Sequence, residues 1–165
     1  MGCASSSSAG AEAPAATKEP PQPKDPYRGQ RNAEGQRHGD GQAMTPDGTY
    51  MGQWADNEME GMGTMRYKTG NVYEGQWKAG KMEGRGSYMY ASGKAEVGCY
   101  YGGVDAGVGV RFSADRQRAV QLLNGQPQAE ITPEDARNLT AEIGLRIPPP
   151  QPKRPPAAAA DVQRM

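Results

Sequence analysis

Residues 73–86 read Tyr-Glu-Gly-Gln-Trp-Lys-Ala-Gly-Lys-Met-Glu-Gly-Arg-Gly. The arrangement of an aromatic residue, a glycine two positions later and a second aromatic residue two positions after that recurs elsewhere in the chain. The central glycines are spaced 23 residues apart, at Gly29, Gly52, Gly75 and Gly98. A constant period of this length is typical of proteins that stack similar structural units. The sequence therefore predicts an array of repeats.

Further marks recur in phase with the central glycines. The flanking positions are mainly aromatic: Tyr27, Tyr50, Tyr73 and Glu96 before the glycine, and Arg31, Trp54, Trp77 and Tyr100 after it. A Gly-x-Gly pair follows in each unit, at Gly39/Gly41, Gly61/Gly63, Gly84/Gly86 and Gly107/Gly109. A glycine closes the first three units, at Gly48, Gly70 and Gly93, whereas the fourth has Arg116. We therefore expect the array to end near Arg116.

Each unit is predicted to be a β-hairpin. Side chains alternate between the two faces of a strand, so Tyr50, Gly52 and Trp54 share a face, and Gly61 and Gly63 share a face in the next strand. Because glycine has no Cβ, it leaves room for an aromatic ring of the neighbouring hairpin. Rings and glycines are therefore expected to interleave along the array.

The turns of these hairpins are predicted at equivalent positions. They hold residues that tolerate a positive φ, as tight hairpin turns require: Asn57, Gly80 and Gly103. In the first unit Gly35 takes this position, with one extra residue inserted.

Residues 73–86 resemble a MORN repeat, and Gln-Arg-His-Gly-Asp-Gly at 36–41 matches the Arg-His-Gly-x-Gly half of that repeat. Units 50–72 and 73–95 match well, and the units on either side are degenerate. The resemblance implies an all-β repeat fold: an elongated single-layer antiparallel sheet of stacked hairpins. The positions that carry the resemblance are Tyr50, Gly52, Trp54, Gly61, Gly63, Tyr73, Gly75, Trp77, Gly84 and Gly86.

The composition favours a thin array over a globular core. Hydrophobic residues make up only 35% of the chain, which contains 23 glycines and 14 prolines, so an array at 27–116 with disordered tails is expected. The formal net charge is zero, which argues against a nucleic-acid partner. The two cysteines, Cys3 and Cys99, lie in contexts that do not suggest pairing, which favours a reducing compartment.

The N-terminus carries an acylation signal. Met-Gly-Cys-Ala-Ser-Ser at 1–6 fits the myristoylation pattern with Gly2 as the acceptor, and Cys3 is placed for a palmitoyl chain. Stable anchoring takes two such signals, and residues 4–26 offer no basic patch as a substitute. We therefore expect Gly2 and Cys3 to be acylated and 1–26 to be a disordered tether. The alternative is that both residues merely begin a Ser/Ala/Pro-rich tail.

The fourth unit differs from the others because its second face is apolar. This face holds Val97, Cys99, Val108, Val110 and Phe112. The region 117–147 is predicted to cover it with a strand at 119–123 and a helix at about 132–143. Thr132 is the expected N-cap, with Pro133 and Asp135 completing the start, and Gly144 ends the helix.

The helix presents a narrow apolar stripe that includes Leu139 and Ile143. We expect this stripe to dock on Val97, Val108, Val110 and Phe112 as a cap, with Leu145 and Ile147 extending the contact. The alternative is an amphipathic helix offered to a membrane or partner, although its mixed charges do not suit an anionic membrane.

The tail at 148–165 is rich in proline and alanine, and disorder is expected. Pro149, Pro152 and Arg154 form a Pro-x-x-Pro-x-Arg motif of the kind that aromatic-lined grooves accept. The alternative is a proline-rich tail with no ligand role.

The sequence offers little chemistry. His38 has no Cys or second His at metal-ligand spacing, and the Gly-x-Gly pairs lack the third glycine and the helix of a phosphate-binding loop. No catalytic residue, cofactor, metal or small-molecule substrate is expected. In the MORN family, activity comes from appended domains, for which this chain has no room.

Three functions are compatible with the sequence. The favoured one is a membrane-tethered scaffold or adaptor on the cytoplasmic face of a membrane, plasma or ciliary, binding protein partners through the sheet. The second is a soluble structural component of a cytoskeletal, ciliary or flagellar assembly. The third is direct phospholipid binding by the repeats, against which the balanced charge argues. The exposed edge of the first hairpin also allows a homodimer.

Overall fold

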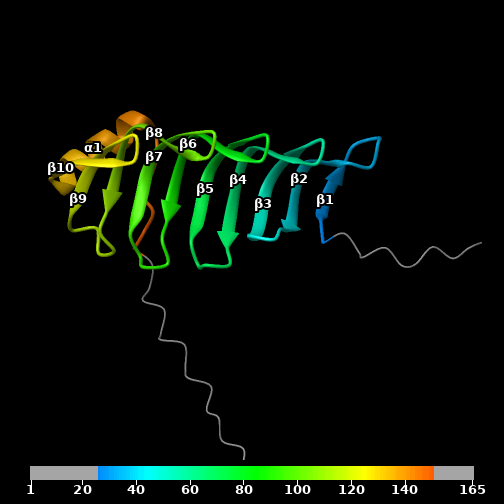
Figure 1. Cartoon of the computed structure of the whole chain (residues 1–165), viewed down its shortest axis with the longest axis horizontal. Helices are drawn as coiled ribbons and strands as arrows, with labels where there is room; N and C mark the ends of the chain where they lie inside the picture. The colour runs from blue at the N-terminus through cyan, green and yellow to red at the C-terminus, as the bar shows by residue number, and fades with distance from the viewer. Residues whose placement is uncertain (1–25, 151–165) are drawn as a thin grey trace, which may run out of the picture.

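The computed structural model describes residues 26–150. They form one antiparallel sheet in which each strand pairs with the next along the chain, and a helix lies at the C-terminal end (Figure 1). The strands are β1 (Arg28–Arg31), β2 (Arg37–Met44), β3 (Gly48–Ala55), β4 (Glu58–Tyr67), β5 (Val72–Lys78), β6 (Lys81–Met89), β7 (Ala95–Tyr101), β8 (Val104–Phe112), β9 (Ala119–Leu123) and β10 (Gln126–Ile131); the helix is α1 (Pro133–Ile143). The predicted all-β, elongated single-layer fold is confirmed.

The hairpin turns have the conformation that the sequence predicts. The values of φ are +75° at Asn57, +74° at Gly80 and +95° at Gly103. The preceding residues also have positive φ, so these are two-residue turns whose twist matches that of the strands. The amide of each turn also donates to a carbonyl of the preceding hairpin, as from Gly80 to Met59 at 3.0 Å. Successive hairpins are therefore joined at their turns as well as along their strands.

The sheet continues beyond the point where the repeat ends. β9 and β10 form a fifth hairpin, which pairs with β8 through β9. β9 matches the predicted strand at 119–123, but β10 was not predicted. Its sequence does not resemble a strand, because Pro127 lacks an amide proton and every side chain except that of Ile131 is exposed. The strand is at the edge of the sheet, where a proline is tolerated.

Two apolar clusters lie on the described part of the sheet. The first consists of rings and a few aliphatic side chains along β2 to β7. The second contains Val97, Val110, Phe112, Ala119 and Ala136, and α1 contacts β7, β8 and β9 there. Along β7 the side chain of Val97 alternates with that of Tyr100, which belongs to the first cluster. The helix therefore covers the face opposite the rings, at the C-terminal end only.

Candidate protein-interaction surface

The rings of successive hairpins form a continuous row along one face, which we call the ring face. Neighbouring rings meet edge to face, with centroids 5.1–5.5 Å apart and planes inclined by 80–89°. Edge-to-face contacts of this kind are favourable because the positive edge of one ring meets the negative face of the next. The order in the row is Tyr27, Trp54, Tyr50, Trp77, Tyr73 and Tyr100.

Each tyrosine fills the space left by a glycine of its own hairpin. A Cβ at Gly63 would collide with the Tyr50 ring, and a Cβ at Gly86 would collide with the Tyr73 ring. The expectation that the ring comes from the neighbouring hairpin was therefore wrong for the tyrosines. The tryptophans do reach across: the indole nitrogen of Trp77 donates to the carbonyl of Gly63 at 3.1 Å.

Hydrogen bonds also fix the tyrosines. The hydroxyls of Tyr50 and Tyr73 each donate to the carbonyl three residues ahead, of Gln53 and Gln76, at 3.0 Å. Burial raises the pKa of both tyrosines above the ordinary value, so the hydroxyls remain protonated donors well into the alkaline pH range. The ring face is thus nearly covered by its own side chains. Tyr50 and Tyr73 have no exposed surface, and the row offers little free ring area to a ligand.

The N-terminal end of the row is closed by arginines. The guanidinium of Arg31, at the position that holds tryptophan in later units, lies 5.1 Å from the centroid of the Tyr27 ring. Arg37 lies 5.5 Å from Tyr27 and 5.1 Å from Trp54. These distances are typical of cation–π contacts. Charged groups therefore replace the ring that a preceding hairpin would supply.

The C-terminal end of the row is closed by an ion pair. In the second and third hairpins, Tyr50 faces Met65 and Tyr73 faces Tyr88 across the strands. In the fourth, the corresponding pair is Glu96 and Arg111, which are bonded to each other. The Glu96 carboxylate is buried, and the ion pair compensates part of the cost of its desolvation.

Beside this pair lies a cavity of about 10 Å³, lined by Glu96, Asp105, several glycines and apolar residues that include Leu122. Burial, and then the nearby Glu96, raise the pKa of the Asp105 carboxyl. The cavity is water-sized, because Leu122 is buried against Gly109 where the earlier hairpins have a tyrosine ring. It is too small for a substrate or cofactor.

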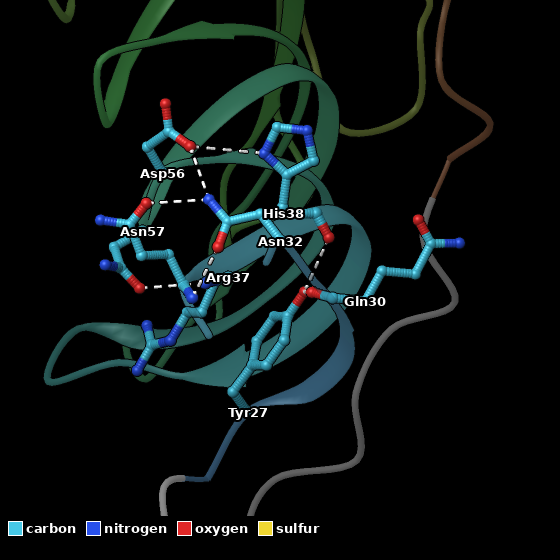
Figure 2. A network of polar contacts seen from close by, with 8 residues as sticks. Tyr27, Gln30, Asn32, Arg37, His38, Asp56 and Asn57 are labelled. Carbon is cyan, nitrogen blue, oxygen red and sulfur yellow. Dashed lines mark hydrogen bonds and ion pairs between the residues drawn. The ribbon is translucent and has the colours of Figure 1, made fainter. Parts of the chain in front are cut away.

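The single histidine lies in a network between the first two turns (Figure 2). Nδ1 of His38 lies 3.5 Å from the Asp56 carboxylate, which also accepts a hydrogen bond from the Asn32 amide at 3.0 Å. Later hairpins have a glutamate at the equivalent position: Glu60 accepts from the amide of Ala79 at 3.1 Å. His38 therefore takes part in the contact between hairpins. Within residues 26–150 no group of three or more His, Cys, Asp or Glu is placed to hold a metal ion.

The helix begins and ends at the predicted residues. The Thr132 hydroxyl accepts from the amide of Asp135, and Gly144 has φ of +76°. Val97, Val110 and Phe112 are buried in the cluster under the helix, against which Leu139, Leu145 and Ile147 pack. Two residues that were predicted to contact across this interface lie outside the cluster. Val108 is 38% exposed and lies outside the cluster, and Ile143 is half-buried without belonging to it.

Val108 is left uncovered because it lies toward the turn end of β8, opposite Leu123, which is itself 45% exposed. Arg85, which was not predicted as a contact, lies at the C-terminal end of α1. A Cβ at Gly144 would meet its guanidinium, which is therefore placed against the C-terminus of α1. A cation is favourable there, and the last turn contains no basic residue.

After the helix, residues 145–150 cross back over the sheet; we call this segment the strap. Arg116 holds it in place: its guanidinium donates to the carbonyls of Pro148 at 3.1 Å, Pro149 at 3.4 Å and Gly93 at 2.8 Å. Pro149, the first proline of the predicted Pro-x-x-Pro-x-Arg motif, is thus part of the strap. Pro152 and Arg154 lie outside the described residues.

The face opposite the rings remains open over the first two hairpins, and we call this part the open face. Met51 and Met62 are more than half exposed there, and Met44 is 67% exposed on the same face. Beside them, the strap and β4 to β6 border a groove of about 500 Å³. Exposed apolar side chains gathered on one face, with a groove next to them, are typical of protein-binding surfaces.

The acylation signal at Gly2 and Cys3 lies outside the described residues. Within residues 26–150 there is no helix with the length and apolar character needed to span a membrane.

A comparison with protein-family models finds two MORN repeats, at residues 50–72 and 73–95. These are the β3–β4 and β5–β6 units, which contain four rings of the row. MORN repeats occur in membrane-associated and protein-interaction proteins, and the family is generally non-catalytic. No curated protein matches the chain.

Proposed function

We propose that this protein is a non-catalytic scaffold or adaptor that binds a protein partner on the open face of its sheet and is held at a membrane by acyl chains on Gly2 and Cys3. The observation that carries the first half is the asymmetry of the sheet. Its ring face is covered by its own side chains, whereas the other face is covered only at its C-terminal end.

The open face has the properties of a docking surface. Methionine side chains are flexible and polarisable, and they adapt to the shape of a bound partner. Polar side chains lie among them: Gln42 faces Met51 across β2 and β3, and Gln76 faces Met62 across β4 and β5. Such a mixture remains soluble alone and still buries apolar area on binding.

Photo-crosslinking tests the protein-binding half. Photo-methionine incorporated into the full chain in cells reports which methionines touch another molecule. We expect crosslinks to protein from Met44, Met51 and Met62, and none from Met65, which is 3% exposed and serves as an internal control. Crosslinks to lipid alone, or none from these three residues, would contradict the proposal and favour direct lipid binding or a different surface.

The tether is supported by the sequence pattern at residues 1–6 and is tested separately. The full chain is translated in a eukaryotic cell-free lysate with an alkyne-labelled myristate, then floated with vesicles. We expect label in the native chain and none after Gly2→Ala. Cys3→Ser should retain the label but weaken flotation, since one acyl chain anchors only marginally. Absence of the myristate label from the native chain would contradict the proposed membrane tether.

The runner-up function, a structural part of a cytoskeletal or ciliary assembly, gives a different result. The Gly2→Ala variant would then remain in a detergent-insoluble fraction of the cell, whereas the proposed scaffold would be released into the soluble fraction.

A further inference from the structure

We propose that the groove between the strap and strands β4 to β6 binds an extended, acidic peptide segment of another protein. This inference rests on the proposed protein-binding function and names the chemistry of the segment that the open face receives. The groove has a volume of about 500 Å³, within the range typical of ligand sites.

The charges that line the groove favour an anionic ligand. Arg66 on β4 and Arg146 on the strap contribute two guanidinium groups, and Glu74 on β5 contributes one carboxylate. All three side chains are exposed, and none has an ion-pair partner within residues 26–150. Guanidinium groups bind carboxylates through two parallel hydrogen bonds, which gives both strength and direction.

The same charges argue against the chain's own tail as the occupant. Lys153 and Arg154 follow the strap after two uncharged residues, and their charges would be repelled by Arg66 and Arg146. An acidic segment is attracted, and a basic residue beside its carboxylates could contact Glu74.

The walls of the groove are fixed before any ligand binds. Three consecutive prolines, Pro148–Pro150, form part of one wall, and each has its φ locked by its ring. Arg116 bonds two of their carbonyls to the body of the protein. The opposite wall is the sheet, where Ser87 is buried and Met89 is half-buried. Little backbone conformational entropy is therefore lost in the groove when it is filled.

The shape of the groove suits an extended chain. It is bordered on one side by an extended proline segment and on the other by strand side chains that contribute both apolar and charged groups, with Met89 and Ile147 as the apolar contacts. An extended segment can place alternate side chains on Arg66 and Arg146 while its apolar side chains cover Met89.

Selection from a phage library of random nine-residue peptides on the immobilised full chain tests the inference. We expect enrichment of sequences containing Asp or Glu. A synthetic copy of the best sequence should bind at least tenfold more weakly to Arg66→Ala and to Arg146→Ala. Arg28→Ala, an exposed arginine on β1, is the matched control and should bind normally. Glu74→Gln should bind an acidic peptide more tightly because a repelling carboxylate is removed.

Circular dichroism and thermal melts of each variant establish that it is folded. Selected peptides without acidic residues, or equal binding to the native chain and both groove variants, would overturn the inference. So would binding to phosphatidylserine vesicles that depends on Arg66 and Arg146 when the peptides do not bind, since this would assign the groove to lipid. Crosslinking from Met51 and Met62 to protein would still support the proposed function in any of these cases.

Discussion

Arg116 donates a hydrogen bond from Nε to the carbonyl of Pro148, 3.1 Å away and 32 residues further along the chain. The equivalent residues in the two preceding units, Gly70 and Gly93, have φ of +88° and +86°, and Arg116 retains a positive φ of +62°. A side chain in this conformation costs about 1–2 kcal/mol. The hydrogen bonds to the strap and to Gly93 offset that cost. The break in the repeat pattern is therefore the attachment point of the C-terminal segment.

Replacing Arg116 by glycine separates these two effects. Arg116→Gly relieves the backbone strain but removes the bonds to Pro148, Pro149 and Gly93. We expect a net loss of about 1–2 kcal/mol in the free energy of unfolding, because several carbonyls lose a charged donor. Trypsin should also cleave faster after Arg146, because the strap that contains this residue is released. Urea denaturation and mass spectrometry of the tryptic fragments measure both effects. Arg118→Ala, in the same loop, is the control; unchanged cleavage after Arg146 in Arg116→Gly would contradict the role given to Arg116.

The tyrosine hydroxyls are expected to contribute measurably to stability. Tyr50→Phe retains the ring and its contacts but removes the donor to the carbonyl of Gln53. The expected loss is about 1 kcal/mol in the free energy of unfolding. Tyr101→Phe is the matched control because Tyr101 is 72% exposed, and it should have no effect. Equal stability of both variants in urea denaturation would mean that the bond of Tyr50 adds nothing.

We predict that the protein tolerates replacement of both Glu96 and Arg111 but is destabilised when Arg111 alone is replaced. Arg111→Met alone leaves the buried Glu96 carboxylate unpaired, and we expect a loss of about 3 kcal/mol. Glu96→Leu combined with Arg111→Met creates an apolar pair, as in the second hairpin, and should be close to native stability. A double-mutant cycle measures the coupling between the two sites. Additive losses in the double variant would show that the pair does not act as a unit.

Asp105 gives the stability of the protein a pH dependence. Burial and the neighbouring Glu96 raise the pKa of its carboxyl in the folded state, so the folded protein binds this proton more tightly than the unfolded chain does. The ionised carboxylate therefore destabilises the fold above the raised pKa, and the penalty disappears as the pH falls below the ordinary pKa of aspartate. Asp105→Asn should raise Tm at pH 7 and leave it nearly unchanged at pH 3. A gain of equal size at both pH values would exclude this cause.

The repeat was predictable because its marks are local. The alternation of Tyr50, Gly52 and Trp54 and the positive-φ residues in the turns depend only on strand and turn geometry. The sequence did not reveal which ring fills which glycine gap, because this depends on the side-chain direction of Tyr50 and Trp77 relative to Gly63.

The remaining features depend on contacts distant in sequence. β10 was missed because Pro127 and its polar neighbours resemble a loop. The strap was missed because Arg116 was interpreted as the end of the array, and nothing near it indicates a bond to Pro148. The exposure of Val108 could not be foreseen either, since it depends on where α1 ends relative to β8.

Tyrosine rings occupy the space that a Cβ would fill at the paired glycines, and a pair of substitutions tests this packing. Gly63 lies under the Tyr50 ring, whereas Gly109 has no ring above it, and neither has a positive φ. Alanine lowers the entropy of the unfolded chain equally at both sites. Urea denaturation should therefore show that Gly63→Ala loses about 2 kcal/mol more than Gly109→Ala, because the ring of Tyr50 must move. Equal losses in the two variants would mean that the Tyr50 ring does not depend on the missing Cβ of Gly63.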